Sequence, residues 1–304
     1  MIPEFKKISL LISITLLLAS CRSRFSDADL TGIAQTNGDI IESFTLDLKE
    51  VSGFSSVITS NDGKKGFYVV GDRKFEIKFI EFDASSADPK AEQKSYKKMI
   101  QDSPKGINSD ETSQWEAIQV LGRQFLFIAE ENRQLIHIVD IKRGRYFKSI
   151  ILKKNSDSKP ALIEFGPPGS TAEGFTKTNR AEVSDTVQSA NNPIFGLSKS
   201  NTIELEPLKI WMSHESNPKG LDISEITTVP NGDLVVLSDQ LQGIFHVEKG
   251  LKPSENTYRF ISRLDLPKKI KKPEGLIAIS ESDYIVGSDT TDNDPNIYHI
   301  RSLP

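Results

Sequence analysis

The sequence predicts an all-β fold, a β-propeller of five blades, with six blades as the alternative. Two observations lead to this prediction. A unit of short strands recurs along the chain, and no long stretch has the periodicity of an amphipathic helix. Four-stranded units repeated roughly every 40–50 residues are typical of propeller blades, whereas a β-sandwich of similar strand content would not require matching units.

The first strand of each unit is short, apolar and entered through a serine or a glutamate. The units start at Ser52, Glu116, Glu173, Ser224 and Glu274, which are 64, 57, 51 and 50 residues apart. The second strand is an apolar run ending in an acid, as in FYVVGD (67–72), LFIAE (126–130) and YIVGSD (284–289). The third strand alternates apolar and polar residues, as in QLIHIVDI (134–141). A fourth strand is visible in some units.

The last unit has only three visible strands. The spare strand IESFTLDL (41–48) lies before the first unit, and we expect it to complete the last blade. Closing the ring in this way removes sheet edges that would otherwise invite aggregation. The predicted propeller domain therefore spans residues 38–304.

Residues 1–20 have the features of an export signal. Two lysines precede a largely apolar run of twelve residues, which is too short to span a bilayer as a helix, since that needs about 20. Cys21, the single cysteine of the chain, follows Leu-Ala-Ser and predicts a lipidated first residue of the mature protein; an ordinary signal with a chance cysteine is the alternative. Residues 21–37 are then a lipid-anchored polar tether. Arg22 predicts sorting to the outer membrane in a Gram-negative host, and to the cell membrane otherwise.

The charge of the chain excludes one class of partner. The formal net charge is −4, and a mildly acidic exported protein lacks the basic surface that nucleic acid requires. We expect a monomer that contacts the membrane through lipidated Cys21 and binds an unidentified protein or small molecule.

The recurring acids predict a cation site. In an antiparallel hairpin the start of the first strand lies beside the end of the second, so the unit-start residues and the strand-ending acids share one rim. Converging carboxylates repel each other, and Ca²⁺, which takes 6–8 oxygen ligands, would relieve that repulsion. The alternative is that the acids cap strand ends. The candidate metal ligands are Glu116, Glu173, Glu274, Glu225, Asp239, Asp289, Glu130 and Asp72.

The histidines favour a structural role. His137, His246 and His299 occupy the same alternating position of the third strand, and a feature copied between blades is typical of scaffold. His214 stands alone, without a visible catalytic partner.

The unit sequences resemble the SdiA-regulated family of bacterial envelope proteins, relatives of the NHL-repeat propellers. The resemblance covers about residues 50–300 and is clearest in VSGFSSVITSNDGKKGFYVVGD (51–72) and PEGLIAISESDYIVGSD (273–289). It implies a five-bladed propeller with a calcium site, and it places the family's acidic patterns at Glu173, Glu274 and residues 222–225. The chain departs from the family where Ala117 follows Glu116 and where Lys199 replaces a rim acid.

Two functional hypotheses follow. The first is a calcium-binding propeller that acts as a ligand- or protein-binding module at the cell envelope. The second is a metal-dependent phosphoesterase of the phytase-like type, or a lactonase-like hydrolase, using a calcium ion at the channel mouth. Either hydrolase would need cations that hold the substrate's oxygens, for which Arg73, Arg133 and Lys199 are candidates.

Overall fold

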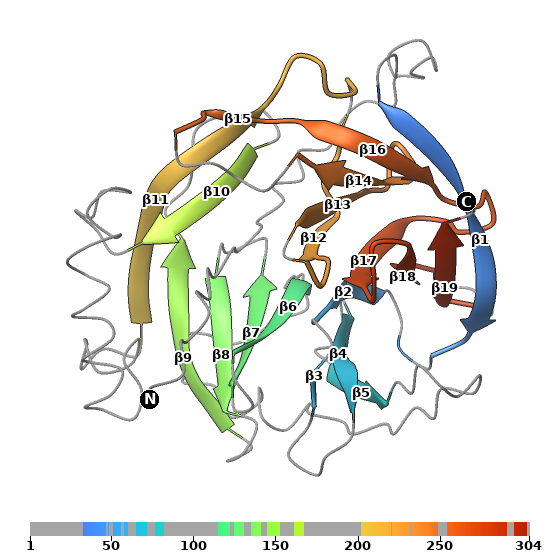
Figure 1. The fold of residues 1–304 in the computed structure, drawn as a ribbon. Coiled ribbons are helices and arrows are strands. Elements are labelled where there is room, and N and C mark those ends of the chain that lie inside the picture. The colour runs from blue at the N-terminus through green and yellow to red at the C-terminus, as the bar shows by residue number, and fades with distance from the viewer. Residues whose placement is uncertain are drawn as a thin grey trace, which may run out of the picture.

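The computed structural model describes residues 33–46, 48, 51–55, 58–59, 65–71, 77–81, 115–121, 125–130, 135–140, 145–152, 161–166, 202–219, 221–231, 233–248, 254–290 and 295–302, and every element within them is a β-strand. The strands form blades arranged in a ring (Figure 1). The predicted all-β propeller is therefore confirmed. The predicted export signal and Cys21 lie outside the described residues.

Four blades can be followed through their hydrogen-bond pairing, and each is named here by its innermost strand. The β2 blade contains β2 (Val51–Phe54), β3 (Ile58–Thr59), β4 (Lys65–Gly71) and β5 (Ile77–Glu81). The β6 blade contains β6 (Trp115–Leu121), β7 (Phe125–Glu130), β8 (Leu135–Asp140) and β9 (Arg145–Leu152). The β12 blade contains β12 (Glu225–Thr228), β13 (Leu234–Ser238), β14 (Gly243–Val247) and β16 (Phe260–Asp265). The β17 blade contains β17 (Pro273–Ala278), β18 (Asp283–Ser288), β19 (Ile297–Ser302) and β1 (Ala34–Phe44).

Between the β6 and β12 blades lies an antiparallel pair, β10 (Ala161–Gly166) and β11 (Thr202–Ser213). β11 also pairs in parallel with β9 near its start, at residues 202–205, and with β15 (Thr257–Tyr258) at its end, at residues 212–213. Glu173, the predicted start of this unit, lies outside the described residues. The number of five blades therefore stays a prediction.

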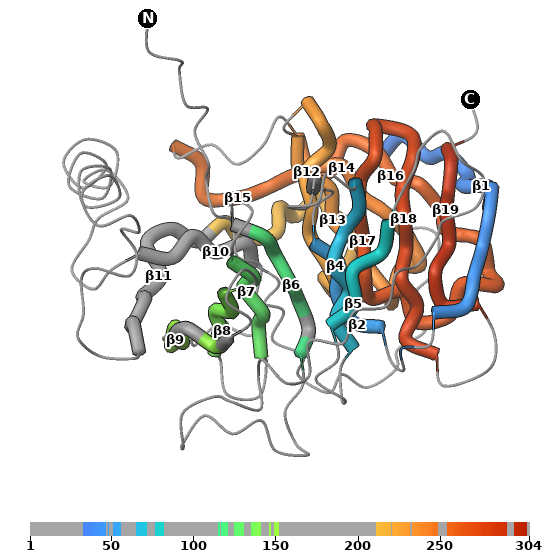
Figure 2. Tube along the Cα trace, turned by 90° about the horizontal axis from the view of Figure 1, so that it is seen from below, coloured from blue at the N-terminus to red at the C-terminus, as the bar shows by residue number. Residues whose placement is uncertain are grey.

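The four innermost strands surround the centre of the ring. β2 contacts both β6 and β17, and β17 contacts β12, so these strands are neighbours although they are far apart in sequence. Figure 1 shows them converging at the middle, with β1, β9 and β11 on the circumference. Figure 2, turned by 90°, shows β4, β6, β18 and β19 running through the thickness of the ring.

The N-terminal strand closes the last blade, as predicted, but it lies earlier in the sequence than expected. β1 pairs antiparallel with β19 from Gly38 opposite Ser302 to Phe44 opposite Ile297. Its first residues, 34–37, pair in parallel with β16 of the neighbouring blade. These residues are exposed, so no apolar alternation marks them in the sequence. The strand consequently begins inside the segment that was expected to be tether.

The apolar runs of the second strands are explained by burial on both faces. Successive side chains of a strand point to opposite faces of the sheet. In β4, Phe67 and Val69 enter a core shared with the β17 blade, whereas Tyr68 and Val70 enter a core shared with the β6 blade. In the same way Tyr284 and Val286 of β18 face the β12 blade, and Ile285 faces the β2 blade. Face-to-face packing of neighbouring blades thus requires apolar residues at consecutive positions.

Glycine allows two blades to approach closely at one point of this core. A Cβ atom added at Gly287 would lie 2.6 Å from the ring of Phe54 and 2.7 Å from Val51, both in the β2 blade. A side chain at this position would therefore push the β2 and β17 blades apart.

Candidate functional site

A β-bulge occurs in the innermost strand of three blades, at the predicted unit starts. In β2 the pairing passes from Val51–Gly71 to Gly53–Val70, which leaves Ser52 as the extra residue. Equivalent register shifts occur at Glu116 in β6 and at Glu274 in β17. A bulge bends the strand and re-aims a side chain. The sequence repeat is therefore also a repeat of local backbone structure.

One end of the β12 and β17 blades gathers charged residues, and this group is called the charged rim. Its members are Asp222, Asp239, Lys272, Glu274 and Asp289. The Lys272 ammonium donates to the Asp289 carboxylate, with 3.1 Å between Nζ and Oδ2. This hydrogen bond, and then the charge of Asp289, raises the pKa of Lys272, and the charges of Glu274 and Asp239 act in the same direction. Acids from two neighbouring blades thus converge on one lysine.

Backbone contacts fix the rim as the hairpin geometry predicts. The Asp239 N–H donates to the Ser224 hydroxyl at 3.2 Å, and the Ser224 N–H donates to the Leu237 carbonyl at 2.9 Å. In the next blade the Asp289 N–H donates to the Lys272 carbonyl at 2.9 Å. Each strand-ending acid is therefore tied to the segment that enters the innermost strand of its own blade.

Asp239 lies in an environment that disfavours its charge. Burial raises its pKa above the ordinary value of 3.8, and the nearby charges of Asp222 and Asp289 raise it further. The charge of Lys272 and a hydrogen bond from Gln242 act in the opposite direction without cancelling the effect. Burial also raises the pKa of Asp222. The rim is thus a place where a bound cation would relieve repulsion.

The rim also holds strained backbone. Within the described ranges, the non-glycine residues with positive φ are Gln242, at 48°, and Lys272, at 44°. Such angles are unfavourable for side chains with a Cβ atom. Gln242 Nε2 donates to the backbone carbonyl and the carboxylate of Asp239, at 2.7 and 2.9 Å. Of the two strained residues, Gln242 therefore contacts Asp239 and Lys272 contacts Asp289.

Two of the predicted acids, Glu130 and Glu225, are buried. The Glu130 carboxylate is fully buried against His137, with 2.7 Å between Oε2 and Nε2. Glu225 is 6% exposed at the start of β12, and its Oε1 accepts the N–H of Ile226 at 3.0 Å. Glu130 thus takes part in a network inside its blade.

The remaining candidates cannot be placed. Asp72, Glu173 and the side chain of Glu116 lie outside the described residues, as do Arg73, Arg133 and Lys199. Among the side chains that are described, no group of three or more His, Cys, Asp or Glu residues is arranged to hold a metal ion. A calcium ion at the charged rim would therefore need water, backbone oxygens or acids from the rest of the chain.

The histidines of the third strands take part in contacts within and between blades. His137 contacts Glu130 and lies 3.5 Å from the Ser149 hydroxyl, and the Tyr146 hydroxyl contacts Ser149 in turn. His246 Nε2 contacts the Tyr284 hydroxyl of the next blade at 2.8 Å, and burial lowers its pKa despite the charges of two nearby acids. These contacts agree with the predicted scaffold role.

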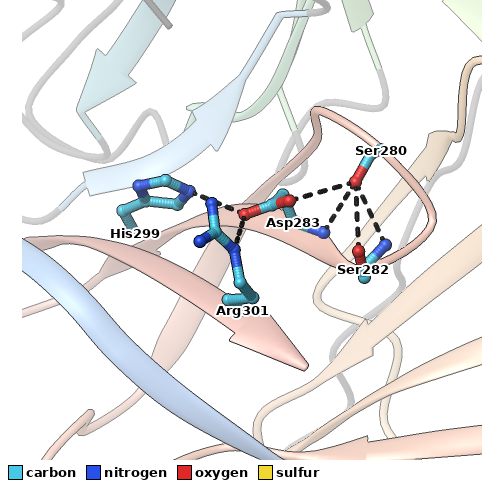
Figure 3. A network of polar contacts seen from close by, with 5 residues as sticks. All are labelled: Ser280, Ser282, Asp283, His299 and Arg301. Carbon is cyan, nitrogen blue, oxygen red and sulfur yellow. Dashed lines mark hydrogen bonds and ion pairs between the residues drawn. The ribbon is translucent and has the colours of Figure 1, made fainter. Parts of the chain in front are cut away.

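The third of these histidines belongs to a polar network at the hairpin of the β17 blade (Figure 3). Asp283 Oδ1 accepts from Arg301 Nε at 2.8 Å and lies 3.2 Å from His299 Nε2. Ser280 Oγ lies 3.3 Å from Asp283 Oδ2 and accepts the backbone N–H groups of Ser282 and Asp283. Burial raises the pKa of Asp283, but the hydrogen bonds and charges of Arg301 and His299 outweigh it and lower the pKa. The network lies at Asp283, where β18 begins, whereas Asp289 follows the other end of the same strand.

The ring of four-stranded blades defines the chain as a β-propeller protein. No protein-family model matches the sequence, and no curated protein matches it. The resemblance to the SdiA-regulated family therefore stays a prediction.

Solved structures with similar folds are distant in sequence. Glutaminyl cyclase of Myxococcus xanthus is 9% identical with a TM-score of 0.47, covering 90% of this chain and 100% of that one. The PQQ-bound aldose sugar dehydrogenase of Streptomyces coelicolor is 10% identical with a TM-score of 0.43, and the similarity covers 90% of this chain and 100% of that one. Virginiamycin B lyase of Staphylococcus aureus is 13% identical with a TM-score of 0.33, and the similarity covers 87% of this chain and 74% of that one. At these scores the similarities give no information about function.

Sequence reasoning missed the importance of Lys272 and Gln242 at the rim. Lys272 directly precedes the Pro-Glu-Gly of a unit start, which is the only signal that could have identified it. Gln242 carries no signal, because its positive φ and its contact with Asp239 arise from the turn between β13 and β14.

Replacing Asp239 with Asn is expected to stabilise the protein at neutral pH in the presence of a chelator. Because the folded pKa of this acid is raised, the folded state binds its proton more readily than the unfolded state, so stability falls as pH rises from 3.8 through the folded pKa. The variant removes that cost, and solvent screening of this partly exposed group keeps the gain below about 1 kcal/mol. Urea unfolding at neutral pH and near pH 4 measures it: the gain should shrink at the lower pH. Asp39→Asn, at an exposed position of β1, is the matched control and should show no such gain.

Proposed function

We propose that this protein is a calcium-binding propeller module attached to the cell envelope through a lipid on Cys21, and that the charged rim is its binding surface. The observation that supports it most is the position of Asp239, whose carboxylate is partly buried beside Asp222 and Asp289 with one lysine nearby. This arrangement costs stability in the free protein, and a bound cation would offset that cost.

Calcium suits the groups that meet at the rim. Ca²⁺ accepts carboxylate, hydroxyl, backbone carbonyl and water oxygens in loose geometry. The rim offers the carboxylates of Asp239 and Asp289 and the hydroxyl of Ser224, which lies at the N–H of Asp239. Asp72, Glu116 and Glu173 are the further ligands proposed from the sequence. Such an ion would link neighbouring blades at the mouth of the ring and help to bind an anionic ligand.

Attachment to the envelope is supported by the signal-like residues 1–20 and by the single cysteine at position 21. In the part of the chain that the structure describes, no helix is long and apolar enough to cross a membrane. Within the described rim the lysine, Lys272, is engaged by Asp289, which favours a binding module over a metal-dependent hydrolase; Arg73, Arg133 and Lys199, the cations proposed for a hydrolase, lie outside the described residues. A hydrolase would require cations available to the substrate.

Thermal unfolding of residues 22–304 with Ca²⁺, with Mg²⁺ and with a chelator tests the proposal. A ligand of the native state at about 100 times its dissociation constant adds roughly 2.7 kcal/mol, which raises the midpoint by several degrees. We expect this rise with Ca²⁺, and we expect Asp239→Asn and Asp289→Asn to remove it. Unchanged midpoints with both ions would show that the rim acids are strand-end caps.

A further inference from the structure

A lysine-rich segment connects the β12 and β17 blades beside the charged rim. We call it the lysine loop, residues 266–273, with the sequence LPKKIKKP. Lys268, Lys269, Lys271 and Lys272 are all exposed. Four lysines within five positions form a local positive charge in a chain whose formal net charge is −4. Such a concentration of like charge on an ordered loop favours an anionic partner.

The backbone of the loop is held firmly, so the lysines are presented in a fixed arrangement. Leu266 and Ile270 are 5% and 1% exposed and belong to the core between the two blades. The Ile270 N–H donates to the Pro267 carbonyl at 2.9 Å, which forms a tight turn around Lys268 and Lys269. The Ser288 hydroxyl donates to the Lys271 carbonyl. Ordering the loop upon binding would therefore cost little entropy.

The acids of the rim act mainly on one end of the loop. Asp289 pairs with Lys272, and the electrostatic interactions of Asp239 include Lys272. Lys268 and Lys269 are separated from that end by the buried Ile270. The pair at positions 268 and 269 is therefore the part of the loop best suited to an external anion.

The course of the N-terminal strand indicates which anionic surface lies close. Residues 34–37 of β1 run parallel to residues 262–265 of β16, and β16 leads directly into the lysine loop. Twelve residues, 22–33, separate Cys21 from β1. At no more than about 3.6 Å per residue they span at most ~43 Å, so a lipid on Cys21 would hold Ala34, which pairs with Ser262 four residues before the lysine loop, within that distance of the membrane.

We infer that the lysine loop docks onto anionic phospholipid headgroups, as a second attachment beside the lipid on Cys21. One acyl signal and a basic patch reinforce each other, because each lysine near an anionic surface strengthens membrane binding. The inference rests on the proposed anchoring, but it requires no calcium. Docking would set the orientation of the propeller on the membrane.

Vesicle co-sedimentation of unacylated residues 22–304, which include every described residue, tests the inference. Vesicles containing phosphatidylglycerol are compared with vesicles of phosphatidylcholine alone, in a chelator and at low and high salt. We expect binding to the anionic vesicles that weakens with salt, and a loss of about tenfold or more in the partition coefficient in the Lys268→Gln/Lys269→Gln variant. The variant Lys65→Gln/Lys219→Gln removes two exposed lysines elsewhere and should bind as the parent chain does.

Equal losses in the two double variants, or equal binding to both kinds of vesicle, would overturn the inference. Thermal unfolding of each variant establishes that its fold is intact. The vesicle assay contains no calcium, so its result is independent of the thermal unfolding with Ca²⁺ that tests the charged rim. Vesicle binding together with an unchanged unfolding midpoint in Ca²⁺ would refute the rim proposal alone. A calcium response without vesicle binding would refute the lysine loop alone.

Discussion

Removal of β1 is expected to abolish the cooperative thermal unfolding of this protein. A chain that begins at Thr45 lacks the strand that pairs with both β19 and β16. Two sheet edges would then be exposed, and Ile40 would no longer pack against the core between the β12 and β17 blades. The loss should exceed the total stability of a typical domain, which is about 5–15 kcal/mol. Circular dichroism and calorimetry of this chain, beside one that begins at Ile33, provide the measurement.

A control chain in which β1 is moved to the C-terminal end tests whether the strand itself, and not its place in the sequence, is required for cooperative unfolding. If residues 33–46 are moved behind Ser302 through a short glycine-serine linker, β1 can still pair with β19, and cooperative unfolding should return. A chain without β1 that unfolds at the same midpoint as the complete one would contradict closure by this strand.

Replacing Glu130 with Ala is expected to lower the free energy of unfolding by about 3–5 kcal/mol. The carboxylate and the His137 ring are 0% and 1% exposed, and loss of one partner leaves the other buried without its 2.7 Å contact. The network continues to Ser149 and Tyr146 across β9, so the disturbance reaches the outer strand of the blade. Urea unfolding monitored by tryptophan fluorescence measures it, because Trp115 lies next to His137.

Two further variants determine whether the pair itself is responsible. Glu130→Gln keeps the shape of the side chain and should lose less than Glu130→Ala. The double variant Glu130→Ala/His137→Ala should lose clearly less than the sum of the two single changes, since residues in one network are coupled. A loss below about 1 kcal/mol in Glu130→Ala, the range of exposed pairs, would show that the contact contributes little.

The fold could be predicted well from the sequence because each blade repeats the same requirements. The runs around Phe67 and Tyr284 are apolar at consecutive positions because both faces of these strands are buried between blades. The acid that follows the second of these runs, Asp289, comes directly after the end of β18. The start of β1 could not be predicted, since residues 34–37 are exposed and pair through their backbone.

The candidate site could be predicted only in part. Asp239, Asp289 and Glu274 do meet near one rim, because hairpin geometry places strand ends beside strand starts. Glu130 ends its strand in the same way, yet its carboxylate contacts the histidine of the adjacent strand. That outcome depends on the alternation of β7 and β8, which places Glu130 and His137 on the same face of the sheet, and residue types alone do not specify it. The positive φ angle of Lys272 is likewise a property of the folded backbone that the residue type does not specify.

Isothermal titration of Ca²⁺ into residues 22–304 tests the central claim most directly, because it measures the ion at the charged rim without relying on stability. The account predicts saturable binding that disappears in the Asp239→Asn/Asp289→Asn variant and persists in Asp39→Asn. Absence of saturable heat in the parent chain, or equal binding in the rim variant, would contradict the charged rim as a calcium site.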